Sequence, residues 1–152
     1  MIKKNIWAIV FLVIIFVIGF FVINYTTRTY RPANIKMVTL AEKAVVVDVA
    51  LSNEKLQKGL SGREGLGEDE GMLFVFENPG RYPFWMKDMN FPIDIIWIGE
   101  DLKVVYVKDN ATPGSYPESF DPGIDAKYVL EVVAGFSEKN NLKPGNVAVF
   151  TY

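Results

Sequence analysis

The chain has 152 residues, enough for one ordinary domain, with half of them hydrophobic and a formal net charge of −2. It contains no histidine and no cysteine, which excludes zinc fingers, iron–sulfur clusters, disulfide frameworks, cysteine nucleophiles and histidine-dependent metal sites. Any chemistry must therefore come from carboxylates, Lys, Arg, Tyr, Ser or Thr, and we expect neither a metal nor a cofactor.

The N-terminal segment, residues 1–25, is predicted to be a membrane anchor. Its apolar run begins at Ile6 and ends at Ile23, 18 residues without a charged or strongly polar side chain. At ~1.5 Å per residue, such a helix would be roughly 27 Å long, close to the ~30 Å hydrocarbon core of a bilayer. A cleaved signal peptide is the alternative, but the run is longer than a usual signal-peptide core and no small-x-small cleavage site follows it. The sequence therefore predicts one uncleaved transmembrane helix.

Basic residues lie on both sides of this span, so the positive-inside rule leaves its orientation nearly balanced. Lys3 and Lys4 precede the span, while Arg28, Arg31 and Lys36 follow it. The very short N-terminal tail favours a cytoplasmic N-terminus. We therefore expect a single-pass membrane protein with an extracytoplasmic soluble domain.

Residues 26–42 are predicted to form a polar tether, and residues 43–152 a single soluble domain. Beyond Ala33, the chain carries 12 Lys and Arg against 18 Asp and Glu, a net charge of −6. An acidic domain repels the phosphates of nucleic acid, so we predict no nucleic-acid partner.

The soluble domain shows mainly the alternation of β-strands, with two short helical segments. The predicted strands cover residues 45–51, 72–76, 84–89, 93–98, 103–108, 128–134 and 147–150. A helix is predicted at 53–59, where Ser52 offers an N-cap and Gly59 a stop, and a second helix at 137–142. The predicted fold class is α+β: a compact, mostly antiparallel β-sheet or partly closed barrel with two short helices, preceded by the transmembrane helix.

Residues 108–125 form a long segment rich in Pro, Gly and Asp. Loops of this length are often functional, and plain disorder at a loop tip is an equally good interpretation. The segment contains Tyr116 and Phe120, two rings that an inert loop would not need. Our hypothesis is that these rings cover a cleft near Trp85.

A series of short motifs in the soluble domain resembles the domain of unknown function 192 (DUF192) family over about residues 43–150. The motifs are Lys58-Gly59-Leu60-Ser61-Gly62-Arg63, Gly71-Met72-Leu73-Phe74-Val75-Phe76, Phe84-Trp85-Met86-Lys87, Pro92-Ile93-Asp94-Ile95, Tyr128-Val129-Leu130-Glu131 and Ala134-Gly135. The resemblance implies a compact β-rich fold, without an agreed activity or cofactor. Ser61-Gly62 and Asp88-Met89 depart from the family's usual residues, so a pocket lined by them would differ from that of the family.

Three carboxylates stand alone in apolar strands and are candidate pocket residues. Asp48, Asp94 and Glu131 each fall on the same strand face as aliphatic neighbours. An ionised carboxylate on a buried face costs several kcal/mol unless it is paired or hydrogen-bonded. Arg63, in a Gly-rich turn, has a guanidinium suited to pair with such a buried carboxylate. A structural ion pair and an acidic pocket with a tuned pKa both remain open.

Aromatic side chains around Trp85 could stack on a ligand, although aromatic residues more often build a core. Trp85 and Lys87, at the end of the Phe84-Trp85-Met86-Lys87 motif, are included in the candidate pocket. The candidate pocket is therefore made of six residues: Arg63, Trp85, Lys87, Asp94, Glu131 and Asp48.

Three functions fit these observations, and no catalytic residue is assigned. The favoured one is an uncharacterised membrane-anchored domain that binds a small molecule or a partner protein. An envelope enzyme would use Asp94 or Asp48 as acid or base, with Arg63 as an anion clamp. A structural accessory of a membrane complex would need no pocket. A concave apolar pocket, acids facing it, or a flat apolar patch would distinguish the three.

Overall fold

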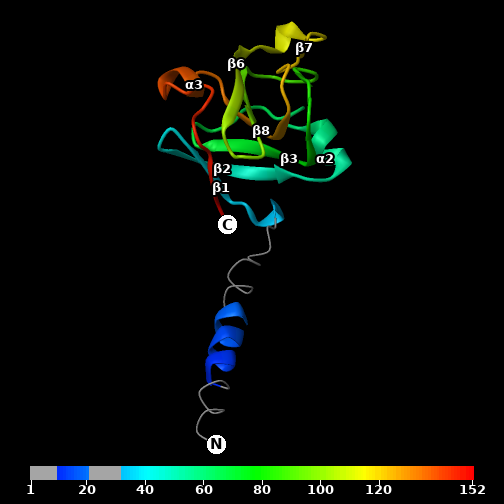
Figure 1. The fold of residues 1–152 in the computed structure, drawn as a ribbon. Helices are drawn as coiled ribbons and strands as arrows, with labels where there is room; N and C mark the ends of the chain where they lie inside the picture. The colour runs from blue at the N-terminus through cyan, green and yellow to red at the C-terminus, as the bar shows by residue number, and fades with distance from the viewer. Residues whose placement is uncertain (1–9, 21–31) are drawn as a thin grey trace, which may run out of the picture. The chain divides into compact units, whose positions relative to one another are not determined.

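The computed structural model describes residues 10–20 and 32–152 of the chain (Figure 1). Residues 10–20 are helical and lie within the predicted transmembrane run. In these two ranges, no helix combines the length and the apolar character that crossing a membrane requires. The ends of the predicted span, residues 6–9 and 21–23, lie outside the described residues. The membrane anchor therefore stays a prediction.

Residues 32–152 form one unit around a seven-stranded sheet with the strand order β6-β5-β8-β3-β2-β1-β9. Its strands are β1 Met37–Leu40, β2 Lys43–Ala50, β3 Glu70–Gly80, β5 Ile93–Ile98, β6 Val104–Ala111, β8 Ala126–Val133 and β9 Val149–Thr151. In this unit β2 and β3 pair in parallel and the other neighbours are antiparallel. A second, two-stranded sheet pairs β4 (Phe84–Trp85) with β7 (Ser119–Phe120). The unit is mostly β and mostly antiparallel, as predicted.

Two short α-helices connect the strands and lie on opposite sides of the sheet (Figure 1). Helix α2 (Asn53–Lys58) makes the parallel crossover from β2 to β3, and the Ser52 hydroxyl caps it by accepting a hydrogen bond from the Lys55 N–H at 3.3 Å. Helix α3 (Phe136–Lys139) follows β8. Two 3₁₀ turns, Pro32–Asn34 and Pro113–Ser115, complete the elements.

The two edge strands approach each other at one end, so the curled sheet becomes a partly closed barrel. The Val104 N–H donates to the Asn146 carbonyl, and the Gly145 N–H donates back to the Val104 carbonyl, both at 2.8 Å. The Ala148 N–H donates to the Leu102 carbonyl, also at 2.8 Å. These bonds satisfy backbone groups that would otherwise lie on open sheet edges.

The central strands bury both of their faces, which explains why all six residues of β5 are buried. The barrel core, inside the curl, holds one set of alternating side chains, including Leu73, Val75, Ile96, Ile98, Leu130 and Val132. The outer core, on the other face, holds the alternate set, including Met72, Phe74, Ile95, Trp97 and Val129. The turn after α2 and the β4–β7 sheet contribute Leu60, Met86 and Phe120 to the outer core.

Three segments differ from the sequence prediction. Residues 37–40, assigned to the tether, form β1, which pairs with β2 and β9 and buries Val38 and Leu40. The strand predicted at 84–89 is limited to Phe84–Trp85, because the chain turns away at Asp88, whose φ is +54°. Residues 108–125 are structured, since β6 continues to Ala111 and β7 pairs with β4.

Candidate functional site

A cavity of about 500 Å³ lies on the outer face of the sheet. Helix α2 and the turn after it form one side, β3 and β8 form the floor, and residues 82–89 form the other side. Its apolar lining comes from Leu56, Phe74, Phe76, Phe84 and Met89. Small-molecule sites commonly occupy ~300–1,000 Å³, so this volume suits a small ligand.

Glu131 is the one carboxyl-bearing residue among those that line the cavity. It belongs to β8, where alternation places it on the outer face together with Val129. Its neighbours on the adjoining strands are Met72 of β3 and Ile95 of β5. Glu131 therefore stands in an apolar patch of the sheet, and the residue is 4 % exposed.

The Glu131 carboxyl lacks the hydrogen bonds that usually accompany a buried acid. Among the described residues, its Oε2 atom has no hydrogen-bond partner. Burial raises the pKa of Glu131 to about 8, while the positive charge of Arg63 acts in the opposite direction. At neutral pH, the group is therefore mostly a protonated acid that can donate its O–H to a ligand.

Gly59 brings the backbone close to this carboxyl group. It ends α2 with a φ of +51°, a conformation that side-chain-bearing residues rarely adopt. A Cβ atom at this position would lie 3.1 Å from the Phe74 Cζ and 3.6 Å from the Glu131 Oε2. A larger residue here would crowd the floor of the cavity.

Aromatic rings contact one another along the cavity wall. Phe84 meets Phe74 edge to face, with ring centroids 4.8 Å apart, and Phe76 stacks on Tyr82 at 3.5 Å. The Trp97 Nε1 donates to the Tyr82 carbonyl at 2.8 Å, which fixes the segment carrying Tyr82 to the outer core. The wall thus offers a pre-formed aromatic surface to a ring or an apolar group.

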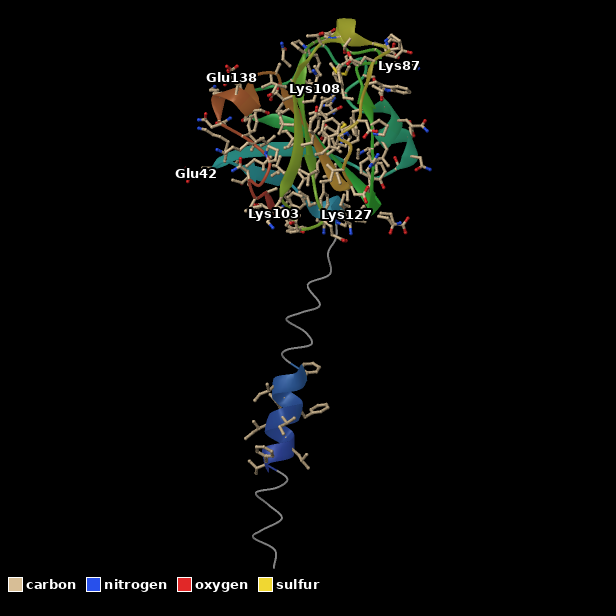
Figure 2. All side chains as sticks on the ribbon, turned by 45° about the horizontal axis from the view of Figure 1, so that its top comes forward. Glu42, Lys87, Lys103, Lys108, Lys127 and Glu138 are labelled. Carbon is tan, nitrogen blue, oxygen red and sulfur yellow. The ribbon has the colours of Figure 1, made fainter. Side chains whose placement is uncertain are left out.

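Two lysines, Lys58 and Lys87, line the mouth of the cavity. They also line an adjoining hollow of about 340 Å³, together with Trp85. The Ser61 hydroxyl donates to the Lys87 carbonyl at 2.8 Å and ties the turn after α2 to the segment after β4. Figure 2 shows Lys87 at the end of the domain opposite to Lys103. Asp88 also lines the adjoining hollow, but the two lysines outnumber it, so the mouth carries a net positive charge although the domain as a whole is acidic.

Arg63 pairs with Asp48 at the surface, where the Arg63 Nη2 lies 2.5 Å from the Asp48 Oδ2. Arg63 therefore does pair with one of the three candidate carboxylates, as expected, but the two side chains are 38 % and 63 % exposed, so the expectation that its partner is buried is wrong for Asp48. Asp48 is on the row of Met72 and Glu131 across the sheet. Other segments of the chain cover this row where it crosses β8, so Glu131 is buried. No segment covers it to the same extent where it crosses β2, so Asp48 is exposed to solvent.

Asp94 is fully buried on the barrel-core face, where backbone N–H groups surround its carboxylate. The Oδ1 atom accepts from Asn110 at 2.9 Å and from Gly135 at 3.2 Å, and the Oδ2 atom accepts from Ser137 at 2.8 Å. Asp94 therefore anchors the start of α3 and the end of β6, and it is not among the residues lining the cavity. In the described part of the chain, no group of acidic residues is placed to hold a metal ion.

The family model DUF192, "Uncharacterized ACR", matches residues 36–150, which covers the sheet and the cavity. The chain belongs to the DUF192 family. The resemblance expected from the sequence motifs is thereby confirmed.

Two solved structures are similar to this DUF192 chain. A protein of unknown function from Novosphingobium aromaticivorans is 30% identical, with a TM-score of 0.71 over 78% of this chain and 89% of that chain. A putative transcription regulator from Sinorhizobium meliloti is 28% identical, with a TM-score of 0.71 over 75% of this chain and 92% of that chain. The search of curated proteins gave no match.

Three of the six residues predicted for the candidate pocket line the cavity of this DUF192 chain. Trp85, Lys87 and Glu131 line it, while Arg63, Asp48 and Asp94 do not. The sequence analysis missed other lining residues, notably Lys58, Phe74 and Tyr82. For Phe74 the signal was present, because β-alternation puts it on the face of Met72 and thus of Glu131. Tyr82 follows a register shift near the end of β3, which has no clear sequence signal.

The two positions at which this chain departs from the family's usual residues contribute to the cavity lining. Ser61 and Met89 both line it.

In the 108–125 segment, the Tyr116 ring lies against Trp85 with centroids 6.4 Å apart, and Phe120 is buried below Lys108. Neither ring lines the cavity itself, so the covering role of this segment stays a hypothesis.

Proposed function

We propose that this DUF192 chain is a membrane-anchored, extracytoplasmic binding protein that holds a small molecule in the cavity beside Glu131. The observation that carries the proposal is the unpartnered, buried carboxyl of Glu131 in an aromatic cavity of about 500 Å³. A buried polar group without a partner costs roughly 1–3 kcal/mol, and a ligand that hydrogen-bonds to it recovers this cost. An apolar cavity with a few inward polar groups is the usual form of a small-molecule site.

The enzyme alternative lacks an equivalent observation. The carboxylate of Asp94 is occupied by three backbone N–H groups, and Asp48 and Arg63 form an exposed ion pair away from the cavity lining. A role in transcription regulation, as in the name of the Sinorhizobium meliloti protein, is not proposed for this chain. The net charge of −6 that this chain carries beyond Ala33 disfavours binding to nucleic acid.

Ligand binding can be tested on the full chain in lipid nanodiscs, with ligand-observed NMR and a library of small ring compounds. We expect at least one compound to bind with a Kd below about 1 mM, and Trp85→Ala to weaken its binding at least about fivefold, since aromatic contacts contribute ~1 kcal/mol or more. Tyr152→Ala is the matched control, because Tyr152 is an exposed ring that does not line the cavity. The proposal fails if no compound binds, or if Trp85→Ala and Tyr152→Ala behave alike.

The anchor can be tested by membrane fractionation. Because residues 6–23 are long enough to span a bilayer, the full chain should remain with membranes after a carbonate wash. A protein of residues 32–152 should stay in the supernatant. Release of a shortened chain that begins near residues 25–30 would instead identify a cleaved signal peptide.

A further inference from the structure

The cavity beside Glu131 has a charge pattern that narrows the class of ligand. Lys58 and Lys87 line the mouth, and the sole acid in the lining is Glu131. At neutral pH that acid is mostly protonated, because burial raises its pKa to about 8. The ionised groups that line the cavity are therefore cationic, and an anion is attracted to its mouth.

Other charged groups do not reverse this pattern. The strand neighbours of Glu131 are apolar, and the charge of Arg63 acts on it with the same sign as that of the lysines. Asp88 lines the outer hollow and not the cavity. Besides Glu131, the titratable side chains in the cavity lining are Lys58, Tyr82 and Lys87. Arg63, in the turn after α2, acts on Glu131 from outside the lining and is itself paired with Asp48 of β2.

The floor and the aromatic wall of the cavity place two further requirements on the ligand. The protonated Glu131 needs a hydrogen-bond acceptor, such as a carbonyl, at the far end of the ligand. The surfaces of Phe74, Phe84 and Trp85 suit a flat or apolar body between the two ends. We infer that the cavity binds a small organic anion whose charge meets Lys58 and Lys87 and whose far end accepts a hydrogen bond from Glu131.

This inference rests on the proposed function, and it makes Glu131 the residue that determines ligand specificity. A cationic ligand would require ionised Glu131 and would release a proton on binding near pH 8. An anion with an acceptor at its far end requires protonated Glu131 and takes up a proton instead. The direction of proton exchange therefore separates the two ligand classes.

The experiment is isothermal titration calorimetry of the full chain in lipid nanodiscs, with para-acetylbenzoate as the probe. Proton exchange is read from the heats in two buffers of different ionisation enthalpy. Para-isopropylbenzoate has nearly the same size without the acceptor, and para-acetylbenzylammonium reverses the charge. We expect para-acetylbenzoate to bind best, with proton uptake near pH 8.

Variants assign the effect to the named groups. Wild type should bind para-acetylbenzoate about tenfold more weakly at pH 9 than at pH 7, because the protonated fraction of Glu131 falls by that factor. Glu131→Gln, which still donates a hydrogen bond, should bind equally at both pH values. Lys58→Gln with Lys87→Gln should weaken binding at least about tenfold, and the control Lys103→Gln should not, since Lys103 lies at the opposite end (Figure 2).

The outcomes distinguish this inference from the proposed function. Preferred binding of the ammonium probe with proton release would overturn the inference and leave a small-molecule site in place. The same holds if neutral compounds bind in a Trp85-dependent way and para-acetylbenzoate does not. Equal affinity of para-acetylbenzoate and para-isopropylbenzoate would also overturn the inference. Absence of any Trp85-dependent binding would refute the proposed function itself.

Discussion

Replacing Glu131 by Gln should make the stability of the domain less dependent on pH. The folded domain holds the Glu131 proton up to about pH 8, whereas an unfolded Glu releases it near 4.5. Below pH 4.5 the carboxyl is protonated in both states, so no charge is buried. As the pH rises from 4.5 to 8, the unfolded state loses the proton first and becomes progressively favoured. Above pH 8 the full loss of stability is present.

The size of this effect follows from the pKa difference. A rise from 4.5 to about 8, at ~1.36 kcal/mol per unit, corresponds to roughly 5 kcal/mol, of which about 4 kcal/mol develops between pH 5 and pH 9. A Gln side chain cannot ionise and does not lose this stability. The difference in the free energy of unfolding between Glu131→Gln and wild type should therefore shift by about 4 kcal/mol in favour of the variant as the pH rises from 5 to 9.

Urea denaturation of residues 32–152, followed by circular dichroism at several pH values, measures the difference. Glu138→Gln is the control, since Glu138 is exposed and lies outside the cavity lining, and it should follow wild type (Figure 2). If the difference in the free energy of unfolding between Glu131→Gln and wild type changes by less than about 1 kcal/mol from pH 5 to pH 9, then Glu131 ionises in the folded domain at little cost. That result would refute a strongly raised pKa for Glu131.

Three further predictions concern the surroundings of the site. Asp94→Asn should lower the free energy of unfolding by about 2–4 kcal/mol, because three buried N–H groups lose a charged acceptor; a loss below ~1 kcal/mol would contradict the anchoring role. Arg63→Ala should lower the free energy of unfolding, measured by urea denaturation, by at most about 1 kcal/mol, since its partner Asp48 is exposed; a larger decrease would indicate a buried pair. In the same variant, NMR titration should show the pKa of Glu131 raised further, because the positive charge of Arg63 is removed. Amide exchange of residues 112–120 should slow when ligand binds if Tyr116 covers the site, and unchanged exchange would exclude a lid.

Most strands could be predicted from the sequence because alternation is a local signal. The run of β5 reads as a buried strand, and the polar residues that cap and end α2 are visible in the chain. Strand β1 was missed because its four residues gain their strand conformation only from pairing with β2 and β9. Strand β7 has two residues and forms against β4, more than 30 residues away in sequence. Such pairings depend on tertiary contacts, which local patterns do not contain.

The candidate site was harder to predict, because alternation assigns a face and does not say what covers it. Asp48 and Glu131 share one row across the sheet, and both stood out as acids among aliphatic residues. The turn after α2 and the 82–89 segment cover the row at Glu131 and leave it open at Asp48. Whether an acid is exposed or buried was therefore decided by segments distant in sequence, which is why the sequence indicated an ion pair of Arg63 with one of these acids but not that the pair is exposed.

Asp94 and Glu131 show how one sequence pattern can lead to opposite energetic roles. Both are buried acids in central strands, but Asp94 faces the N–H groups at the start of α3 and at the end of β6, which stabilise its negative charge. Glu131 faces aromatic rings and a cavity, which stabilise only its protonated form. A hydrophobic residue in place of Asp94 would leave three buried N–H groups without an acceptor. A hydrophobic residue in place of Glu131 would remove a destabilising group, so stability alone gives no reason for an acid at this position, whereas the ligand recognition proposed above would give one.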